Sequence, residues 1–258
     1  MGKFYLIIGL LFSVYGFSQK DKPYAVPSSA VTPKQVATVD MYKIISISKD
    51  TTAVDTSLTI QKEYRFNYLR KDIFGLMPFA NEGQTYNTLQ YSLKKHQYLP
   101  EMGFSAKHFN FMEAKQIQYY HVPTPYTELY YRSVMEQGQN VDAFITINTS
   151  KNLNFFIGYK GLRSIGKYIN ALTSTGNFRF GLSYQTEGGR YVLNTNVLYQ
   201  DILNNENGGI KNNAEFESDD PDYKERGRLD VNLKDASTLL KGRSFFSSHE
   251  RRRKSNGC

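Results

Sequence analysis

The 258-residue chain contains no Trp, and its single Cys is the last residue, Cys258. One cysteine excludes an intrachain disulfide framework and a cysteine-rich metal site. Long apolar runs are also missing after Ser18. No later segment therefore approaches the length of about 20 apolar residues that a helix needs to cross a bilayer. Any membrane insertion by the mature chain must use strands.

The first eighteen residues are typical of a cleaved secretory signal peptide. Lys3 supplies the positive start, and residues 4–17 form an apolar stretch that is followed by a charged segment. Small residues at Gly16 and Ser18 predict cleavage between Ser18 and Gln19. The alternative is an uncleaved anchor, but the stretch is shorter than a bilayer crossing requires. We therefore expect export through a cleaved signal peptide.

Motifs for catalysis or metal binding are also scarce. Gly161 and the Gly166-Lys167 pair have the spacing of a phosphate-binding loop, but Tyr168 replaces the hydroxyl residue that would hold Mg²⁺. The four histidines show no spacing that pairs them as metal ligands. Four acidic residues between positions 219 and 225 could hold a hard cation, although a solvated acidic loop is the favoured interpretation. We expect no enzyme, and no catalytic, cofactor or metal site.

The chain is instead rich in Tyr and Phe, with 20 and 17 copies, yet its mean hydropathy is −0.51. A transmembrane barrel combines these traits, because only alternate strand residues face lipid and the others face a polar lumen. The net charge is +8, and the last twelve residues contribute +3 of it. We regard those residues as a basic tail outside the folded part, and therefore expect no nucleic-acid partner.

Alternation of apolar and polar residues predicts strands over most of the chain. It is clearest in five segments, at residues 128–135, 142–148, 153–160, 177–185 and 190–200, and weaker at residues 42–48, 58–68, 87–93, 101–110 and 228–234. The polar side of the clear strands supplies the candidate lumen-facing residues. They are Arg132, Asp142, Asn148, Asn154, Lys160, Arg179, Arg190, Asn194 and Asn196. Four are cationic and one is anionic, which indicates a mild anion preference.

The connections between these strands alternate in length. Those at residues 150–152 and 188–189 are tight, whereas those at 136–140, 161–175 and 201–227 are longer. Bacterial barrels have short periplasmic turns and longer extracellular loops, so we expect the longer connections to face outside. The predicted fold class is all-β, an antiparallel up-and-down transmembrane β-barrel. A soluble β-sandwich is the alternative.

Five segments carry a resemblance to a known family. They are TPYTELYY at 124–131, EQGQ at 136–139, LNFFIGYKGLRS at 153–164, FANEGQTY at 79–86 and DILNNENGG at 201–209. In order and spacing the chain resembles the N-terminal part of the putative porin family of Bacteroidetes-type Gram-negative bacteria, from about Tyr42 to about Phe246. The resemblance implies an outer-membrane barrel without catalytic residues. Its implied partners are outer-membrane lipid, small solutes and the barrel assembly machinery, with a homo-oligomer left open.

The resulting domain organisation has four parts: a signal peptide (1–18), a flexible periplasmic leader (19–40), the N-terminal part of a barrel (41–246) and a basic tail (247–258). About nine strands would leave two unpaired edges, which hydrocarbon does not tolerate. We therefore expect a fragment or frameshifted product. The predicted function is passive passage of small solutes. The alternatives are a plugged or narrow barrel that binds a ligand or partner through its outer loops, and a secreted β-sandwich that acts as a binding module.

Overall fold

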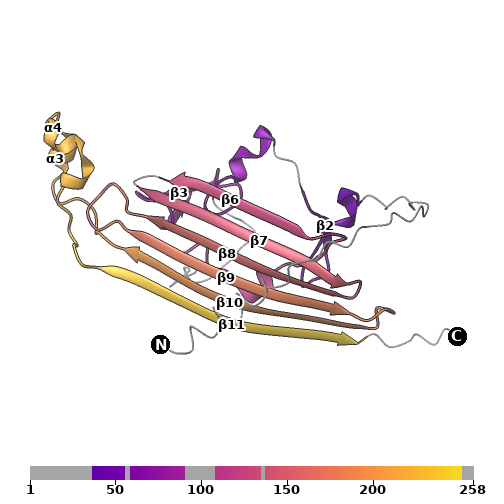
Figure 1. Cartoon of the computed structure of the whole chain (residues 1–258). Helices are drawn as coiled ribbons and strands as arrows, with labels where there is room; N and C mark the ends of the chain where they lie inside the picture. Colours follow the sequence, from indigo (N-terminus) through magenta and orange to yellow (C-terminus); the bar gives the residue numbers. More distant parts are fainter. Residues whose placement is uncertain (1–36, 56–58, 91–107, 135–136, 252–258) are drawn as a thin grey trace, which may run out of the picture. The chain divides into compact units, whose positions relative to one another are not determined.

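The computed structural model describes residues 37–55, 59–90, 108–134 and 137–251. The predicted signal peptide, its cleavage site at Ser18 and Gln19, and most of the leader lie outside these ranges. The main element is a six-stranded antiparallel meander in the order β11-β10-β9-β8-β7-β6 (Figure 1). Its strands are β6 (Tyr126–Val134), β7 (Gly138–Ser150), β8 (Leu153–Ser164), β9 (Thr173–Gln185), β10 (Tyr191–Asn205) and β11 (Ser237–Arg251).

Each strand of this sheet pairs with its neighbour in the sequence, as the alternating patterns predict. Residues 151–152 and 186–190 connect strands at one end of the sheet, and Gly189 gives the second turn a positive φ of 62°. The connections at 165–172 and 206–236 lie at the other end. The longer of these carries α3 (Asn213–Glu217), α4 (Pro221–Lys224) and η5 (Arg226–Arg228), which Figure 1 shows beyond the ends of the strands.

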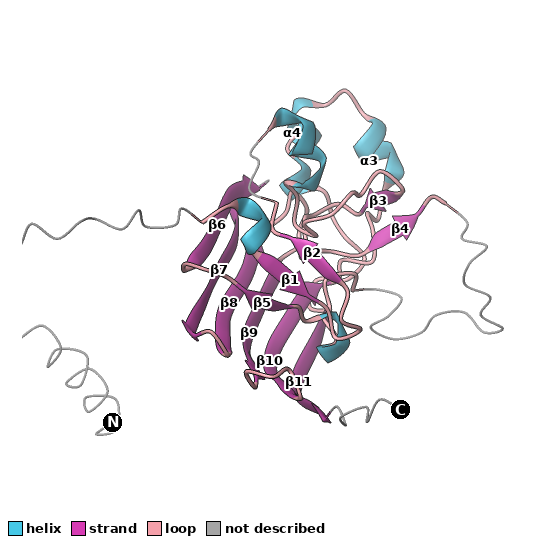
Figure 2. Cartoon of the chain, turned by 90° about the vertical axis from the view of Figure 1, so that its right-hand side faces the viewer, coloured by secondary structure: helices cyan, strands magenta, loops and turns pink. Residues whose placement is uncertain are grey.

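The described residues between 37 and 122 form a second layer, which we call the inner layer. It contains a three-stranded sheet of β1 (Lys43–Ile45), β2 (Thr51–Ala53) and β5 (Tyr119–His121), and a hairpin of β3 (Leu76–Pro78) and β4 (Tyr86–Thr88). The short helices η2 (Val39–Met41), η3 (Ile60–Arg65) and η4 (Ala114–Gln116) complete it. Figure 2 shows these elements on one side of the curved six-stranded sheet.

An aromatic core joins the two layers. Ile117 and Tyr119 of the inner layer pack with Phe144, Phe156 and Leu198 of the sheet, and all five are buried. The rings of Tyr119 and Phe156 meet edge to face, with centroids 6.2 Å apart. The inner layer is therefore packed on the sheet as part of one folded unit, and does not lie apart from it.

The expectation that the whole of residues 41–246 contributes barrel strands is wrong for the inner layer. The predicted strand at 58–68 is the helix η3 from Ile60 onward, and the one at 42–48 shrinks to β1. In its described part, the segment at 87–93 contributes Asn87 and Thr88 to β4, and residues 91–93 and most of the segment at 101–110 lie outside the described residues. At 228–234 there is a single bridge between Ile210 and Val231. Alternation alone does not make a strand, because the segment also needs a partner edge.

Strand β11 is longer than the sequence patterns indicate. All fifteen of its residues pair with β10, including 247–251, which the sequence analysis assigned to the basic tail. Its alternation is obscured because small, charged and apolar residues occur on both faces, as Leu239, Lys241 and Phe245 show on one of them. Residues 237–251 are therefore a strand because they pair with β10, although their hydrophobic pattern does not indicate one.

The described strands form an open sheet. Within the described part of the chain, β6 and β11 are its two edges and do not pair with each other, so these residues form an antiparallel meander and no closed barrel; the sequence analysis expected an incomplete part of a barrel with two unpaired edges. No helix in the described ranges is long and apolar enough to span a membrane.

Gly181 tests how tightly the two layers pack. A Cβ atom there would lie 2.2 Å from the Phe156 ring, whereas one at Gly176, in the same strand, would lie 3.5 Å from the Tyr159 hydroxyl. Gly181→Ala should therefore displace Phe156 and lower the free energy of unfolding by about 1–3 kcal/mol. Gly176→Ala is the matched control and should change it far less. Urea unfolding in detergent micelles, followed by circular dichroism, measures both; equal effects would contradict the packing described.

Candidate functional site

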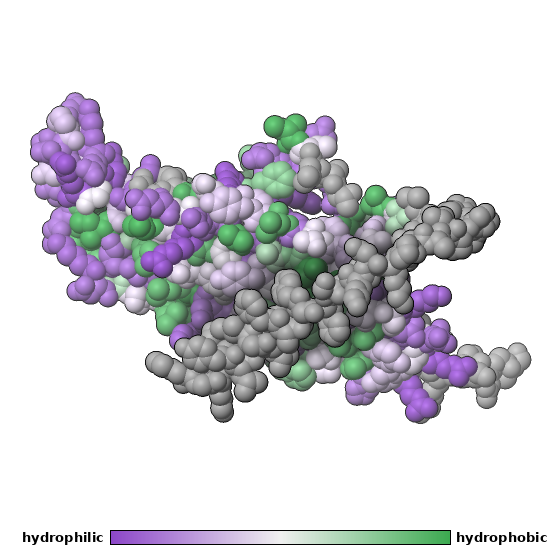
Figure 3. Space-filling view, in the orientation of Figure 1, coloured by the Kyte–Doolittle hydropathy of each residue, from purple (hydrophilic) through white to green (hydrophobic). Residues whose placement is uncertain are grey.

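The face of the sheet opposite the inner layer exposes large apolar side chains. Leu129 in β6 is 75% exposed and Phe245 in β11 is 71% exposed. Ile157, Tyr159 and Tyr199 on the strands between them are also exposed. In Figure 3, hydrophobic residues are interspersed with more hydrophilic ones over the visible part of the strands, while hydrophilic residues gather on the loop that carries α3 and α4. Exposed apolar side chains occur on all six strands of this face, with charged residues such as Lys241 and Arg243 among them in β11. Such a face indicates contact with lipid or with another protein.

The face under the inner layer is mostly polar around the aromatic core, and most of it is buried. Cross-strand pairing places eight of the nine candidate lumen residues on it, because directly opposed residues point to the same side of a sheet. Arg190 is the ninth, and it lies exposed in the turn before β10. Lys160, Asn154 and Asn196 are fully covered. Eight buried polar residues that the sequence analysis did not select share this face: Asn140, Thr146, Ser164, Thr173, Thr175, Asn177, Gln200 and Asn204. Their alternation with apolar neighbours could have identified most of them.

A group of charged residues joins the two layers. The Arg179 guanidinium donates to Asp142 Oδ1 at 2.8 Å, and Arg70 Nε of the inner layer lies 3.9 Å from Asp142 Oδ2. Arg70 also pairs with Glu128 in β6, and its guanidinium lies 4.2 Å from the centroid of the Tyr130 ring. Buried or half-buried charges are stable only when paired, so this network holds the inner layer to the sheet.

Lys160 is the most deeply buried of these cations, with 6% of the residue exposed. Its ammonium group donates to Asn110 Oδ1 and lies 4.8 Å from the centroid of the Tyr68 ring. The Tyr68 hydroxyl donates to Thr175 in β9 at 3.2 Å. Burial raises the pKa of Tyr68 to about 12. Tyr68 therefore stays neutral at physiological pH and serves Lys160 as an aromatic face and not as a counter-ion.

Asn81 anchors the β3–β4 hairpin to the loop end of the sheet. Its amide nitrogen donates to the carbonyl oxygens of Ala171 and Ser164 at 2.7 and 3.2 Å, and its oxygen accepts from the Ser164 hydroxyl at 2.7 Å. The Thr173 hydroxyl donates to the Glu82 carbonyl at 2.6 Å. The inner layer is thus hydrogen-bonded to the six-stranded sheet at this end and ion-paired to the sheet nearer its middle.

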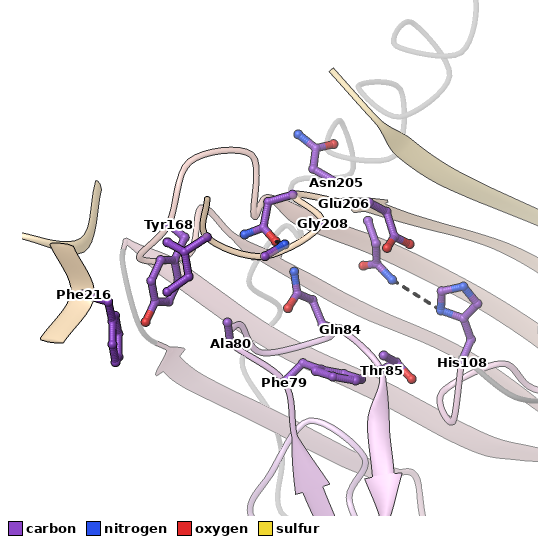
Figure 4. A pocket seen from close by; sticks show the side chains of 14 residues that line it. Phe79, Ala80, Gln84, Thr85, His108, Tyr168, Asn205, Glu206, Gly208 and Phe216 are labelled. Atoms are coloured by element: carbon purple, nitrogen blue, oxygen red, sulfur yellow. Dashed lines mark hydrogen bonds between the residues drawn. The ribbon is translucent and has the colours of Figure 1, made fainter. Parts of the chain in front are cut away.

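A cavity of about 490 Å³ lies between that hairpin and the segment after β10. Figure 4 shows its lining side chains, which include Phe79, Tyr168 and Phe216. Near one end, Asn204 Nδ2 lies 3.4 Å from His108 Nδ1, which is drawn as the dashed line in Figure 4. The volume of this cavity and its mixture of aromatic and polar side chains are typical of small-molecule pockets.

The motifs that the sequence analysis set aside show no catalytic arrangement. Gly161 lies in β8, and the segment after Lys167 continues as a loop into β9 and not as a phosphate-binding helix. In the acidic segment, Asp222 and Glu225 pair with Arg228. Across the described ranges, no three His, Cys, Asp or Glu residues are grouped as a metal site.

A family model described as putative porin matches residues 38–252, which is most of the chain. The chain belongs to the putative porin family. Membership confirms the family that the sequence resembles and implies an outer-membrane location; that the chain corresponds to the N-terminal part of the family stays a prediction. The match extends a few residues beyond both ends expected from the sequence, so it includes the end of β11. No curated protein and no solved structure matches the chain.

Removing the Asn81 side chain tests whether the inner layer is held to the sheet at this end. Asn81→Ala should leave the Ala171 and Ser164 groups without their partner and lower local stability by about 1–3 kcal/mol. Hydrogen exchange of the β3–β4 hairpin should then become at least about tenfold faster. Asn87→Ala, in the exposed part of the same hairpin, is the control. Unchanged exchange in Asn81→Ala would show that the hairpin does not depend on this anchor.

Proposed function

We propose that the protein forms an outer-membrane β-barrel of porin type, with the six-stranded sheet as part of its wall. The inner layer lies inside this wall and narrows the path, so that only small solutes pass. The observation that carries the proposal is the inverted polarity of the sheet, with an exposed apolar face and a buried polar face. A water-soluble sandwich would bury the apolar face and expose the polar one.

Strand length supports a membrane location for the sheet. The strands have 9, 13, 12, 13, 15 and 15 residues from β6 to β11. A tilted strand needs about 9–11 residues to cross the hydrocarbon layer. Each strand is therefore long enough to span it, and most would extend beyond it. Outer-membrane lipid is accordingly the proposed environment of Leu129, Ile157 and Phe245.

The buried polar face supports a hydrated interior. Both amide atoms of Asn140, and the amide oxygens of Asn177 and Asn196, have no hydrogen-bond partner among the described residues. Buried polar atoms without partners are rare in dry protein interiors, because each one is costly unless water reaches it. Their position on one face agrees with a lumen that admits water between the wall and the inner layer.

Closure of the wall requires further strands. Six strands are fewer than the roughly eight of the smallest single-chain outer-membrane barrels, and an open edge is not stable in hydrocarbon. We propose that additional strands join β6 and β11. The barrel assembly machinery would insert such a wall.

The cavity beside Phe79, Tyr168 and Phe216 favours a second candidate function, ligand binding at the loop end of the barrel. It lies where the segment after β10 meets the inner layer. In this second candidate function, the inner layer blocks the path through the barrel, and the protein binds a ligand without conducting solutes. Conductance separates the two candidates.

The test is insertion and conductance of the purified protein and of a variant lacking residues 39–122. We expect the wild type in outer-membrane fractions and in discrete, small conductance steps in planar bilayers. Removal of the inner layer should increase the step size several-fold, because the lumen widens. A variant lacking residues 212–228, which include α3, α4 and η5, is the control and should keep the wild-type steps. Recovery as a soluble monomer without channels would contradict the barrel, and an inserted wild type without steps would favour the second candidate.

A further inference from the structure

A second cavity, of about 350 Å³, lies between the inner layer and the middle of the sheet. Four cationic side chains line it, Arg70 and Lys71 from the inner layer and Lys160 and Arg179 from the sheet. Asp142 is the single carboxylate in its lining. The cavity is therefore strongly basic, and its volume lies in the range of small-molecule sites.

The ion pairs leave a surplus of positive charge at this cavity. Asp142 is shared by Arg179 and Arg70, and Glu128 outside the lining pairs with Arg70. Among the described residues, neither Lys160 nor Lys71 forms an ion pair; Lys160 contacts Asn110 and the Tyr68 ring, and Lys71 lies 5.7 Å from the Phe109 centroid. Four cations and two carboxylates leave a net charge of +2.

Burial makes the charge of Lys160 significant, because only 6% of that residue is exposed, whereas Lys71 is exposed. A buried ammonium group without an opposite charge is unfavourable, because the protein interior solvates it less well than water does. A ligand carboxylate or phosphate in the cavity would supply the missing charge and accept hydrogen bonds from both lysines. The lining also includes Phe144 and Phe156, which offer an apolar surface to the rest of a small organic anion.

We propose that this cavity is a binding site for a small anion, whose carboxylate or phosphate group is held by Lys160 and Lys71. The inference rests on the proposed function, because it places the site on the solute path between the wall and the inner layer. The inference also specifies the solutes of the proposed function, which would be small organic or inorganic anions. Arg70 and Arg179 are occupied by Asp142 and Glu128, so they contribute to the field around the site more than to direct contact.

Isothermal titration calorimetry of the full chain in detergent micelles, at low ionic strength, tests the site. Inorganic phosphate and succinate are titrated separately, so the preferred anionic group is identified. Lys160→Met should weaken binding about tenfold or more, and Lys71→Met should weaken it less. Glu128→Gln removes a competing carboxylate and should strengthen binding. Lys151→Met, at the exposed turn between β7 and β8, makes the same charge change elsewhere and should leave affinity unchanged.

The opposite directions expected for Lys160→Met and Glu128→Gln distinguish anion binding from a structural role of the charged group. If Lys160→Met does not fold, Lys71→Met and Glu128→Gln decide, with Lys151→Met as the control. Two results would overturn the anion site and leave the proposed function intact. In the first, the wild type conducts but binds neither probe. In the second, Lys151→Met weakens binding as much as Lys160→Met does. Binding that follows the predicted order in a protein without conductance would support the site and contradict the passage of solutes.

Discussion

The structure depends on one constraint, which is that the two faces of a single sheet meet opposite surroundings. The outward side chains in the middle of β8 are apolar and exposed, as Ile157 and Tyr159 are, while the residues between them are buried. Because side chains alternate strictly along a strand, a slip of one residue in the register would exchange the two faces. The long, continuous pairing from β6 to β11 prevents such a slip. The curved sheet, the aromatic core and the charged groups all follow from this division.

The inner layer gives the polar face a packed interior in its middle without removing its charge. Phe144 and Phe156 reach from the sheet to Tyr119 and Tyr120, and the Tyr120 and Phe144 centroids are 4.7 Å apart. Around these rings the contacts are ion pairs and amide hydrogen bonds, such as that of Asn196 to the Tyr119 hydroxyl at 2.9 Å. Burial also raises the pKa of Tyr120 to about 12, so its hydroxyl stays neutral at physiological pH. Under the proposed function, a layer held in this way would narrow the lumen and still present charge to a solute.

Sequence patterns predicted the six-stranded sheet better than the inner layer. The five clear alternating segments all lie in strands of the sheet, and eight of the nine candidate lumen residues share its covered face. The inner layer was misread because segments such as Ile60–Arg65 alternate by chance, and nothing local indicates that they lack a partner edge. Strand β11 was missed for the opposite reason. It has a partner strand, β10, but its sequence lacks a clear alternation of apolar and polar residues. The basic cavity joins Arg70 and Lys71 to Lys160 and Arg179 across a long sequence separation, which only the fold brings together.

The most direct test of this account is the environment of successive positions along β8. Single cysteines carrying spin labels, introduced as Ile157→Cys, Tyr159→Cys, Asn154→Cys and Lys160→Cys with Cys258→Ser, can be measured in lipid vesicles. Collision with oxygen, which concentrates in lipid, should be high for the first two labels and low for the other two. Equal access of all four to a water-soluble nickel chelate would contradict a sheet that divides lipid from a covered polar interior.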